Sequence, residues 1–262
     1  MEGKQLSLFS PTEKQHRPKK QKTAKLGRYQ KLQKELENNE SDRYKTFPDI
    51  NSPPLTNCHY NFVDLFCGAG GMTLGLTNAG FNPVASVEIN PIASETHRKN
   101  FPQCHHFNGE IQDFKPREWL EAIASPEIHL VAGGPPCQGF SVAGKRNPND
   151  PRNSLFREFI RVVSEIRPWY IVMENVPGIL TTKKGLVKDE ICQAFVDIGY
   201  DNVSIAILES AAYRVTQIRP RAIFIANRFG MQNPYPKPQL LPHQYQSIES
   251  AISDLPEYTP IP

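Results

Sequence analysis

The feature that most constrains the fold is a regular alternation of short apolar runs with longer amphipathic segments from residue 60 onward. Six runs have the β-branched and aromatic content of buried strands: YNFVDLF, PVASVEI, HLVAGG, WYIVMENV, NVSIAIL and RAIFIA. Helical spacing covers Met72–Ala79, Ile92–Asn100, Pro116–Ala124, Leu155–Ile166 and Leu186–Ile198. Such alternation predicts an α/β fold, with a parallel, doubly wound sheet covered by helices on both faces.

The N-terminal part of the chain has a different composition. Residues 12–45 are polar and Lys-rich with almost no aliphatic side chains, so they cannot bury enough apolar surface to offset the entropy of ordering. We therefore expect residues 1–58 to form a mobile basic arm with a Pro-containing linker, and residues 59–262 to form one domain. The composition leaves open whether the arm attracts DNA or only aids solubility.

Cysteine usage and hydropathy indicate a cytoplasmic protein. The five cysteines show no C-x-x-C spacing and follow no N-terminal apolar segment, which disfavours a secreted disulfide framework. No apolar run approaches the length that crosses a bilayer. Cys104–His106 contains zinc-ligand types, but adjacent strand residues point to opposite faces and no second ligand pair follows. We expect no metal site.

The stretch DLFCGAGGMTLGL predicts a ligand-binding loop between the first strand and the first helix. Its glycines Gly68, Gly70 and Gly71 let the backbone approach a bound molecule without Cβ clashes. The second apolar run ends near Glu88, whose carboxylate suits a pair of ribose hydroxyls. Together these residues predict a nucleoside-containing cofactor at the carboxyl edge of the sheet, without deciding which one.

The stretch GGPPCQGFS places a cysteine at the same edge. Pro135 and Pro136 restrict the backbone directly before Cys137, so the thiol has a fixed direction beside the predicted cofactor pocket. A thiol held in this way is typical of a nucleophile and not of a structural cysteine.

Four motifs, DLFCGAGG, GGPPCQGFS, ENVPGIL and QIRPR, occur between Phe62 and Ala226 in the order and spacing of one family. The chain resembles the DNA (cytosine-5) methyltransferases. The resemblance implies S-adenosyl-L-methionine as cofactor, duplex DNA as substrate, and a mostly parallel seven-stranded sheet whose last strand is antiparallel. Residues 59–262 then form the catalytic domain.

The resemblance also implies roles for individual residues. Cys137 corresponds to the nucleophile that adds to C6 of a flipped-out cytosine. Glu174 corresponds to the residue that holds N3 and the exocyclic amine, and Arg221 to the donor to O2, with Arg219 positioning it or the thiol. Asn175 is expected to support the cysteine loop, and the phosphate-binding loop is expected to include Ser141, Lys145 and Arg146.

Cofactor contacts follow from the same resemblance. It puts Phe66 beside the adenine, Gly68, Gly70 and Gly71 at the methionine end, Glu88 on the ribose and Ile89 against the base. Glu110 and Ile111 stand where the family usually has Asp before an apolar residue. Arg214 and Thr216 stand where it tends to have Gly and Pro.

The segment after QIRPR differs most from the family, in which a target-recognition domain and two further motifs follow. Here 36 residues follow Ala226. We expect the catalytic half of a split enzyme in preference to a truncated remnant, with a second subunit covering exposed apolar surface. The alternatives are an RNA cytosine-5 methyltransferase, which the GFS continuation disfavours, and a non-catalytic cofactor-binding module, which would be expected to lack Cys137, Glu174 or Arg221.

One further motif lies near the start of the chain. QLSLF, at Gln5–Phe9, resembles the peptide that binds the bacterial sliding clamp. That resemblance implies a bacterial host and an enzyme associated with the nucleoid, while the alternative is a segment that packs on its own domain.

Overall fold

The computed structural model describes residues 60–123, 127–136 and 154–255. A single seven-stranded sheet has the order β3-β2-β1-β4-β5-β7-β6. The predicted N-terminal arm, Gln5–Phe9 and the segment Cys137–Arg146 lie outside the described residues. The strands are β1 (Asn61–Leu65), β2 (Asn82–Glu88), β3 (His105–Asn108), β4 (Leu130–Gly133), β5 (Tyr170–Asn175), β6 (Asn202–Glu209) and β7 (Pro220–Asn227).

The strand directions confirm the predicted fold. β1 to β5 pair in parallel, and β7 lies antiparallel between β5 and β6. The six apolar runs correspond to six of these strands. The seventh strand, β3, was not among those runs because its sequence HHFN is polar and at most half-buried at the sheet edge.

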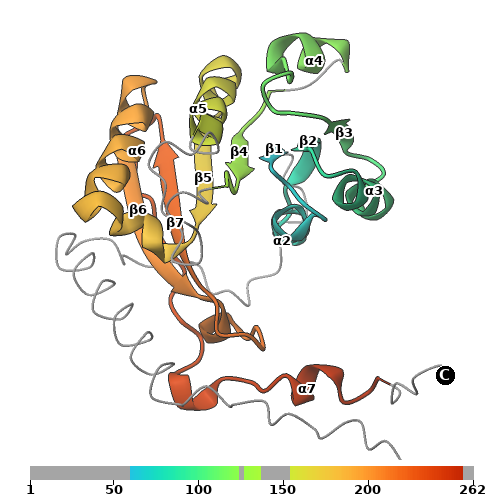
Figure 1. Cartoon of the computed structure of the whole chain (residues 1–262), viewed down its shortest axis with the longest axis vertical. Coiled ribbons are helices and arrows are strands. Elements are labelled where there is room, and N and C mark those ends of the chain that lie inside the picture. The colour runs from blue at the N-terminus through green and yellow to red at the C-terminus, as the bar shows by residue number, and fades with distance from the viewer. Residues whose placement is uncertain (1–59, 124–126, 137–153, 256–262) are drawn as a thin grey trace, which may run out of the picture.

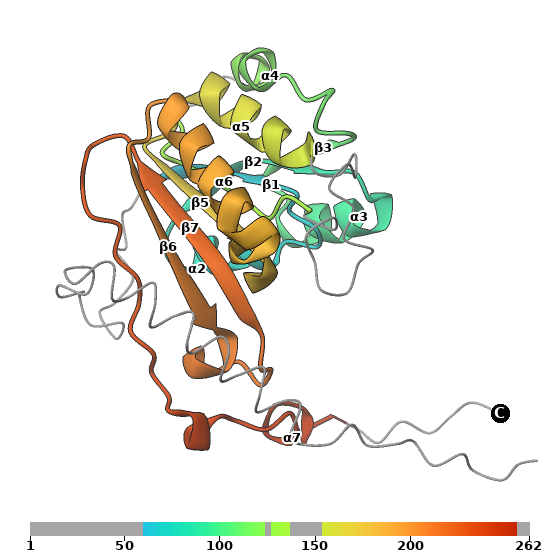
Figure 2. The same ribbon diagram turned by 60° about the vertical axis from the view of Figure 1, so that its left-hand side comes forward.

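Helices cover the sheet in two layers (Figures 1 and 2). α5 and α6 lie along one face, with α4 beside α5, while α2 and α3 lie against the other face. None of the helices in the described ranges is long and apolar enough to span a membrane. The helices are α2 (Gly71–Asn78), α3 (Pro91–Asn100), α4 (Pro116–Ala122), α5 (Ser154–Ile166), α6 (Leu186–Asp197) and the short α7 (Glu249–Ile252).

The two faces of β5 differ in burial. Ile171 and Met173 point into the core under α5 and α6 and are fully buried. Tyr170 and Val172 point to the opposite face, are half-buried, and line a groove of about 860 Å³. The groove, called here the aromatic groove, is lined by Tyr60, Leu76, Phe81, His129, Leu130, Trp169, Tyr170, Val172, Ile225, Phe229, Met231 and Pro234.

Candidate active site at the carboxyl edge of the sheet

Glu174 and Arg221 form an ion pair between Glu174 Oε1 and Arg221 Nε. Glu174 is near the end of β5, and β7 begins at the same edge because it runs antiparallel, which brings Arg221 beside Glu174. The contact is electrostatic and not a directed hydrogen bond, since Arg221 Nε has no acceptor in hydrogen-bond geometry among the described residues. Their side chains are 29% and 19% exposed, so both remain accessible.

The end of β5 also holds the segment that leads to the predicted nucleophile. Asn175 Nδ2 donates a hydrogen bond of 3.0 Å to the carbonyl of Pro135. A Cβ on Gly134 would lie 3.1 Å from Glu174 Oε2, so the glycine permits the carboxylate to approach the backbone. Cys137 itself lies outside the described residues. The structure thus brings together Glu174, Arg221 and the two residues that precede Pro136.

The first arginine of the QIRPR motif, Arg219, has different surroundings. Arg219 is exposed, its backbone N–H donates to Glu209 Oε1 at 2.6 Å, and its carbonyl accepts from Ser210 Oγ at 2.9 Å. These contacts hold the backbone that enters β7. Nearby, Arg214 adopts a left-handed φ of 68°, a conformation that suits the glycine that the family tends to have there.

The predicted cofactor loop connects β1 to α2, and Glu88 at the end of β2 holds it. Glu88 Oε2 accepts from the Gly68 N–H at 2.9 Å, and Oε1 accepts from the Asn90 N–H at 2.8 Å. Gly70 has a φ of 99°, and a Cβ there would lie 2.4 Å from the Phe101 ring, so only glycine fits. A Cβ added at Gly68 or at Gly71 would have no atom within 4 Å, so there is room for a ligand next to both glycines.

The other predicted cofactor residues lie around this loop. Phe66 is half-buried with a φ of 59°, and Ile89 is 60% exposed directly after Glu88. Glu110 is exposed, whereas the Ile111 side chain is only 3% exposed and packs in the core. An acid, an exposed apolar residue and open glycines at one strand edge fit the nucleoside and amino-acid parts of S-adenosylmethionine.

Behind the loop lies a buried polar network that sequence reasoning missed. Thr73 donates to Asp64 Oδ2 at 2.5 Å and contacts His97 Nε2 at 3.0 Å. Burial raises the pKa of Asp64 to about 7, and burial lowers the pKa of His97 to about 4. Asp64 was visible as the one charged residue in the first apolar run, but only the tertiary structure shows that His97 lies behind it.

A family model described as C-5 cytosine-specific DNA methylase matches residues 60–261. The chain belongs to this family. Members of the family use S-adenosylmethionine. The match includes all seven strands and the carboxyl edge that carries Glu174, Arg221 and Glu88.

Curated relatives share this part of the chain. Type II methyltransferase M1.HphI of Haemophilus parahaemolyticus is 39% identical over 199 residues, which are 75% of this chain and 53% of that protein. Type II methyltransferase M.AquIA of Picosynechococcus is 38% identical over 224 residues, which are 76% of this chain and 90% of that protein. The chain spans about half the length of most of the curated relatives at the head of the comparison.

Solved structures agree with the fold. A putative DNA modification methyltransferase encoded within an Escherichia coli prophage superimposes with a TM-score of 0.63 at 30% identity, covering 76% of this chain and 56% of its own. DNMT2 of Spodoptera frugiperda superimposes with a TM-score of 0.57 at 25% identity, covering 77% and 61%.

Proposed function

We propose that this chain transfers a methyl group to C5 of a cytosine in duplex DNA through a covalent adduct with Cys137. The observation that carries the proposal is the Glu174–Arg221 ion pair beside the Pro135 carbonyl that Asn175 holds. An acid and a guanidinium at one strand edge, next to the segment that leads to a cysteine, supply the groups that a pyrimidine needs for activation.

The covalent step assigns one task to each group. The Cys137 thiolate forms a bond to C6, and the π electrons of the C5–C6 bond move to C5, which becomes the methyl acceptor. In its protonated form Glu174 donates to N3 and accepts from the exocyclic amine, and Arg221 donates to O2, so the charge developing on the ring is neutralised. A base then removes the C5 proton, the released electron pair re-forms the C5–C6 double bond, and the sulfur–C6 bond breaks to free the Cys137 thiolate. Arg219 positions the strand end.

The loop between β1 and α2 is proposed to hold S-adenosylmethionine, which supplies the methyl group when bound. Glu88 would accept from the ribose hydroxyls, Phe66 and Ile89 would flank the adenine, and Gly68, Gly70 and Gly71 would face the methionine end. Glu110 and Ile111 would approach the adenine amine, with Ile111 offering backbone atoms because its side chain is buried.

The proposed substrate is duplex DNA with the target base rotated out of the stack. C6 is shielded between stacked neighbours, so the thiolate reaches it only after unstacking, at a cost of a few kcal/mol. Ser141, Lys145 and Arg146 would then contact phosphates, because hydroxyl and cationic side chains on a polar loop suit backbone oxygens.

A direct test of the covalent step uses two cysteine variants. Cys137→Ser should abolish methyl transfer while cofactor binding stays within about twofold of wild type, because the thiol acts only in the covalent step. Cys192→Ser, on α6, is the matched control and should retain activity. Wild-type protein with any required partner should form a denaturation-resistant adduct with 5-fluorocytosine DNA. Turnover by Cys137→Ser would contradict the mechanism.

We further propose that a second polypeptide docks in the aromatic groove and supplies target recognition. The groove is apolar, and Phe229 and Met231 on its rim are about half exposed. M.AquIA gives additional support, because 90% of this relative is matched and it therefore has little sequence beyond the matched part. M1.HphI, in contrast, is matched over only 53% of its length.

Co-expression tests the second polypeptide. The chain should methylate duplex DNA only when expressed with the product of the adjacent reading frame. Phe229→Asp should block this complementation, whereas Leu186→Asp, a similarly exposed position on α6, should not. Robust site-specific methylation by the 262-residue chain alone would contradict the split enzyme without affecting the assignment of Cys137.

A last proposal is that Gln5–Phe9 binds the bacterial sliding clamp and draws the enzyme to replicating DNA in the nucleoid. Its support is the sequence QLSLF alone. A purified clamp should retain the wild-type chain and release the Leu8→Ala, Phe9→Ala variant. Equal retention of both proteins would remove the proposal.

A further inference from the structure

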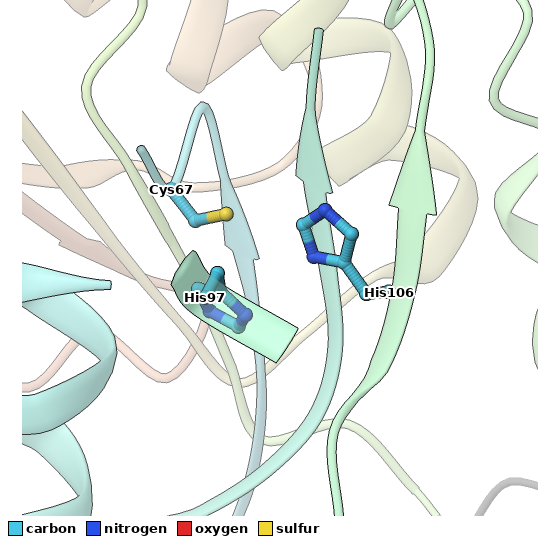
Figure 3. A group of neighbouring side chains, drawn as sticks. All are labelled: Cys67, His97 and His106. Carbon is cyan, nitrogen blue, oxygen red and sulfur yellow. The ribbon is translucent and has the colours of Figure 1, made fainter. Parts of the chain in front are cut away.

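The side chains of Cys67, His97 and His106 converge behind the cofactor loop (Figure 3). One ligand atom of each lies within 4.8 Å of the other two. The residues come from the turn after β1, from α3 and from β3, so only the folded chain brings them together. We propose that these three side chains form a zinc-binding site.

His106 carries the observation that points most directly to a ligand. Its Nε2 is buried and has no hydrogen-bond partner among the described residues, which is costly for an imidazole nitrogen. Its Nδ1 lies 2.7 Å from Ser86 Oγ. When Nδ1 donates to that hydroxyl, Nε2 keeps its lone pair. A metal-bound histidine commonly has this arrangement, with one nitrogen on the metal and the other on an oxygen.

His97 is also oriented by a hydrogen bond, which comes from the buried network of Thr73 and Asp64. When Asp64 is ionised, the Thr73 hydroxyl donates to Asp64 and accepts from His97, so His97 Nε2 carries the ring proton. Nδ1 then keeps a lone pair, and its contact to Ser86 Oγ is long, at 3.5 Å. A carboxylate acting through a hydroxyl thus fixes the tautomer of His97 in which Nδ1 can bind a metal.

Cys67 supplies the third ligand. Its thiol donates weakly to the Gly68 carbonyl, at 3.7 Å. The Cys67 side chain is buried, and a bound cation would compensate the charge of its thiolate there. On zinc binding the sulfur–hydrogen bond breaks, a sulfur–zinc bond forms, and the proton leaves to solvent.

The geometry requires small rotations. The two imidazole rings are stacked, with centroids 5.0 Å apart and planes at 30°, so each ring must turn for both lone pairs to meet one ion. The terminal torsion of histidine is broad, which keeps that cost low. Zinc bond lengths set the ligand atoms roughly 3.3–3.6 Å apart, so the cluster has to contract by about 1 Å.

One of the three proposed ligands, His106, lines a pocket that opens to the surface. This pocket of about 440 Å³ is lined by Cys104, His105 and His106 together with residues of α3. It could admit the ion and a water molecule as the fourth ligand, which three protein ligands leave open. Bound zinc would join the turn after β1 to α3 and β3. It would thereby brace the loop whose Gly68 N–H binds Glu88.

Cobalt(II) substitution and zinc titration test this site in the full chain. Chelator-treated protein should bind one equivalent of zinc, and cobalt should produce a thiolate charge-transfer band with tetrahedral ligand-field bands. Cys67→Ser should lose the charge-transfer band, and His106→Gln should bind zinc about tenfold more weakly or worse. Cys104→Ser, a neighbouring buried thiol outside the cluster, and Cys137→Ser are the controls that should keep the band.

Circular dichroism of each variant establishes whether it is folded. If Cys67→Ser does not fold, the zinc affinity of His106→Gln tests the proposed site instead. Absence of saturable one-to-one binding overturns the proposal. So does a band that survives Cys67→Ser or disappears in Cys137→Ser, because the thiolate would then come from elsewhere.

Discussion

The two halves of the sheet's carboxyl edge are built in different ways. In the proposed cofactor half, Glu88 holds Gly68 and Asn90, and all three come from the first two strand–helix units. In the proposed cytosine half, Asn175 reaches back to Pro135 and Glu174 pairs with Arg221, so three distant segments meet. The first half depends on local loops. The second depends on the strand order β4-β5-β7.

This difference predicts that the two halves fail differently when mutated. Changes in the cofactor half should alter cofactor affinity or stability, because its side chains hold backbone groups of the same loop. Changes in the cytosine half should alter the rate of methyl transfer at saturating cofactor, because its charged pair is accessible and contributes little to the core.

The largest expected effect separates two glutamates. Glu174→Gln should lower the rate of methyl transfer by about 10²–10⁴-fold with an unchanged KM for S-adenosylmethionine, since it removes a group that acts on the pyrimidine. Glu88→Gln should instead raise that KM with a smaller effect on kcat. Steady-state kinetics of the active assembly measure both. Equal effects of the two variants on kcat would remove the distinction between the halves.

The next effect concerns Asp64, which lies under the cofactor half. Burial raises its pKa from 3.8 to about 7, so the unfolded chain releases this proton at lower pH than the folded chain. Between about pH 4 and pH 7 the folded state binds more protons, and the free energy of unfolding therefore falls as the pH rises. The stabilising contribution of Asp64 is fully present below its unfolded-state pKa of 3.8 and is lost above its folded-state pKa of about 7. It amounts to at most about 4 kcal/mol.

Urea unfolding of wild type and Asp64→Asn across this pH range tests the effect, with metal removed from both proteins. The difference between their unfolding free energies should slope across the window, while the contribution of His97, present in both, cancels. A constant difference from pH 4 to pH 7 would show that Asp64 titrates normally.

The sequence predicted the sheet and the glycine turn after β1 well because their signals are local. Buried strands leave continuous apolar runs, and the glycines of residues 68–71 mark a turn that needs φ values above zero. β3 was missed because an edge strand needs no apolar alternation. The family resemblance singled out Glu174 and Arg221 separately, and only the structure shows that they form an ion pair. The contacts of His97 and His106 could not be predicted, because they depend on how α3 and β3 pack.

Two adjacent glycines lie at the junction of the halves and should behave differently. Gly133 pairs with Leu65, and a Cβ would lie 2.5 Å from the Leu65 carbonyl oxygen, so Gly133→Ala should cost about 1–3 kcal/mol of unfolding free energy. At Gly134 the nearest atom is the accessible Glu174 Oε2, which can move. Gly134→Ala should keep its stability within about 0.5 kcal/mol and lower kcat about tenfold or more by displacing the carboxylate. Denaturant melts and kinetics of both variants measure this, and a stable Gly133→Ala protein would contradict it.

The smallest effect compares one asparagine from each half. Asn90 caps α3 by accepting from the Ile92 and Ala93 N–H groups, and Asn175 holds the Pro135 carbonyl. Either alanine variant should cost about 1 kcal/mol of unfolding free energy. Asn90→Ala keeps the backbone N–H that Glu88 accepts, so cofactor affinity and kcat should both stay near wild type. Asn175→Ala releases the segment before Cys137, so kcat should fall although the loss of stability is the same.

Denaturant melts together with single-turnover methylation separate these outcomes. If Asn90→Ala lost as much kcat as Asn175→Ala, the decrease would reflect general destabilisation and not the way in which the cytosine half is assembled.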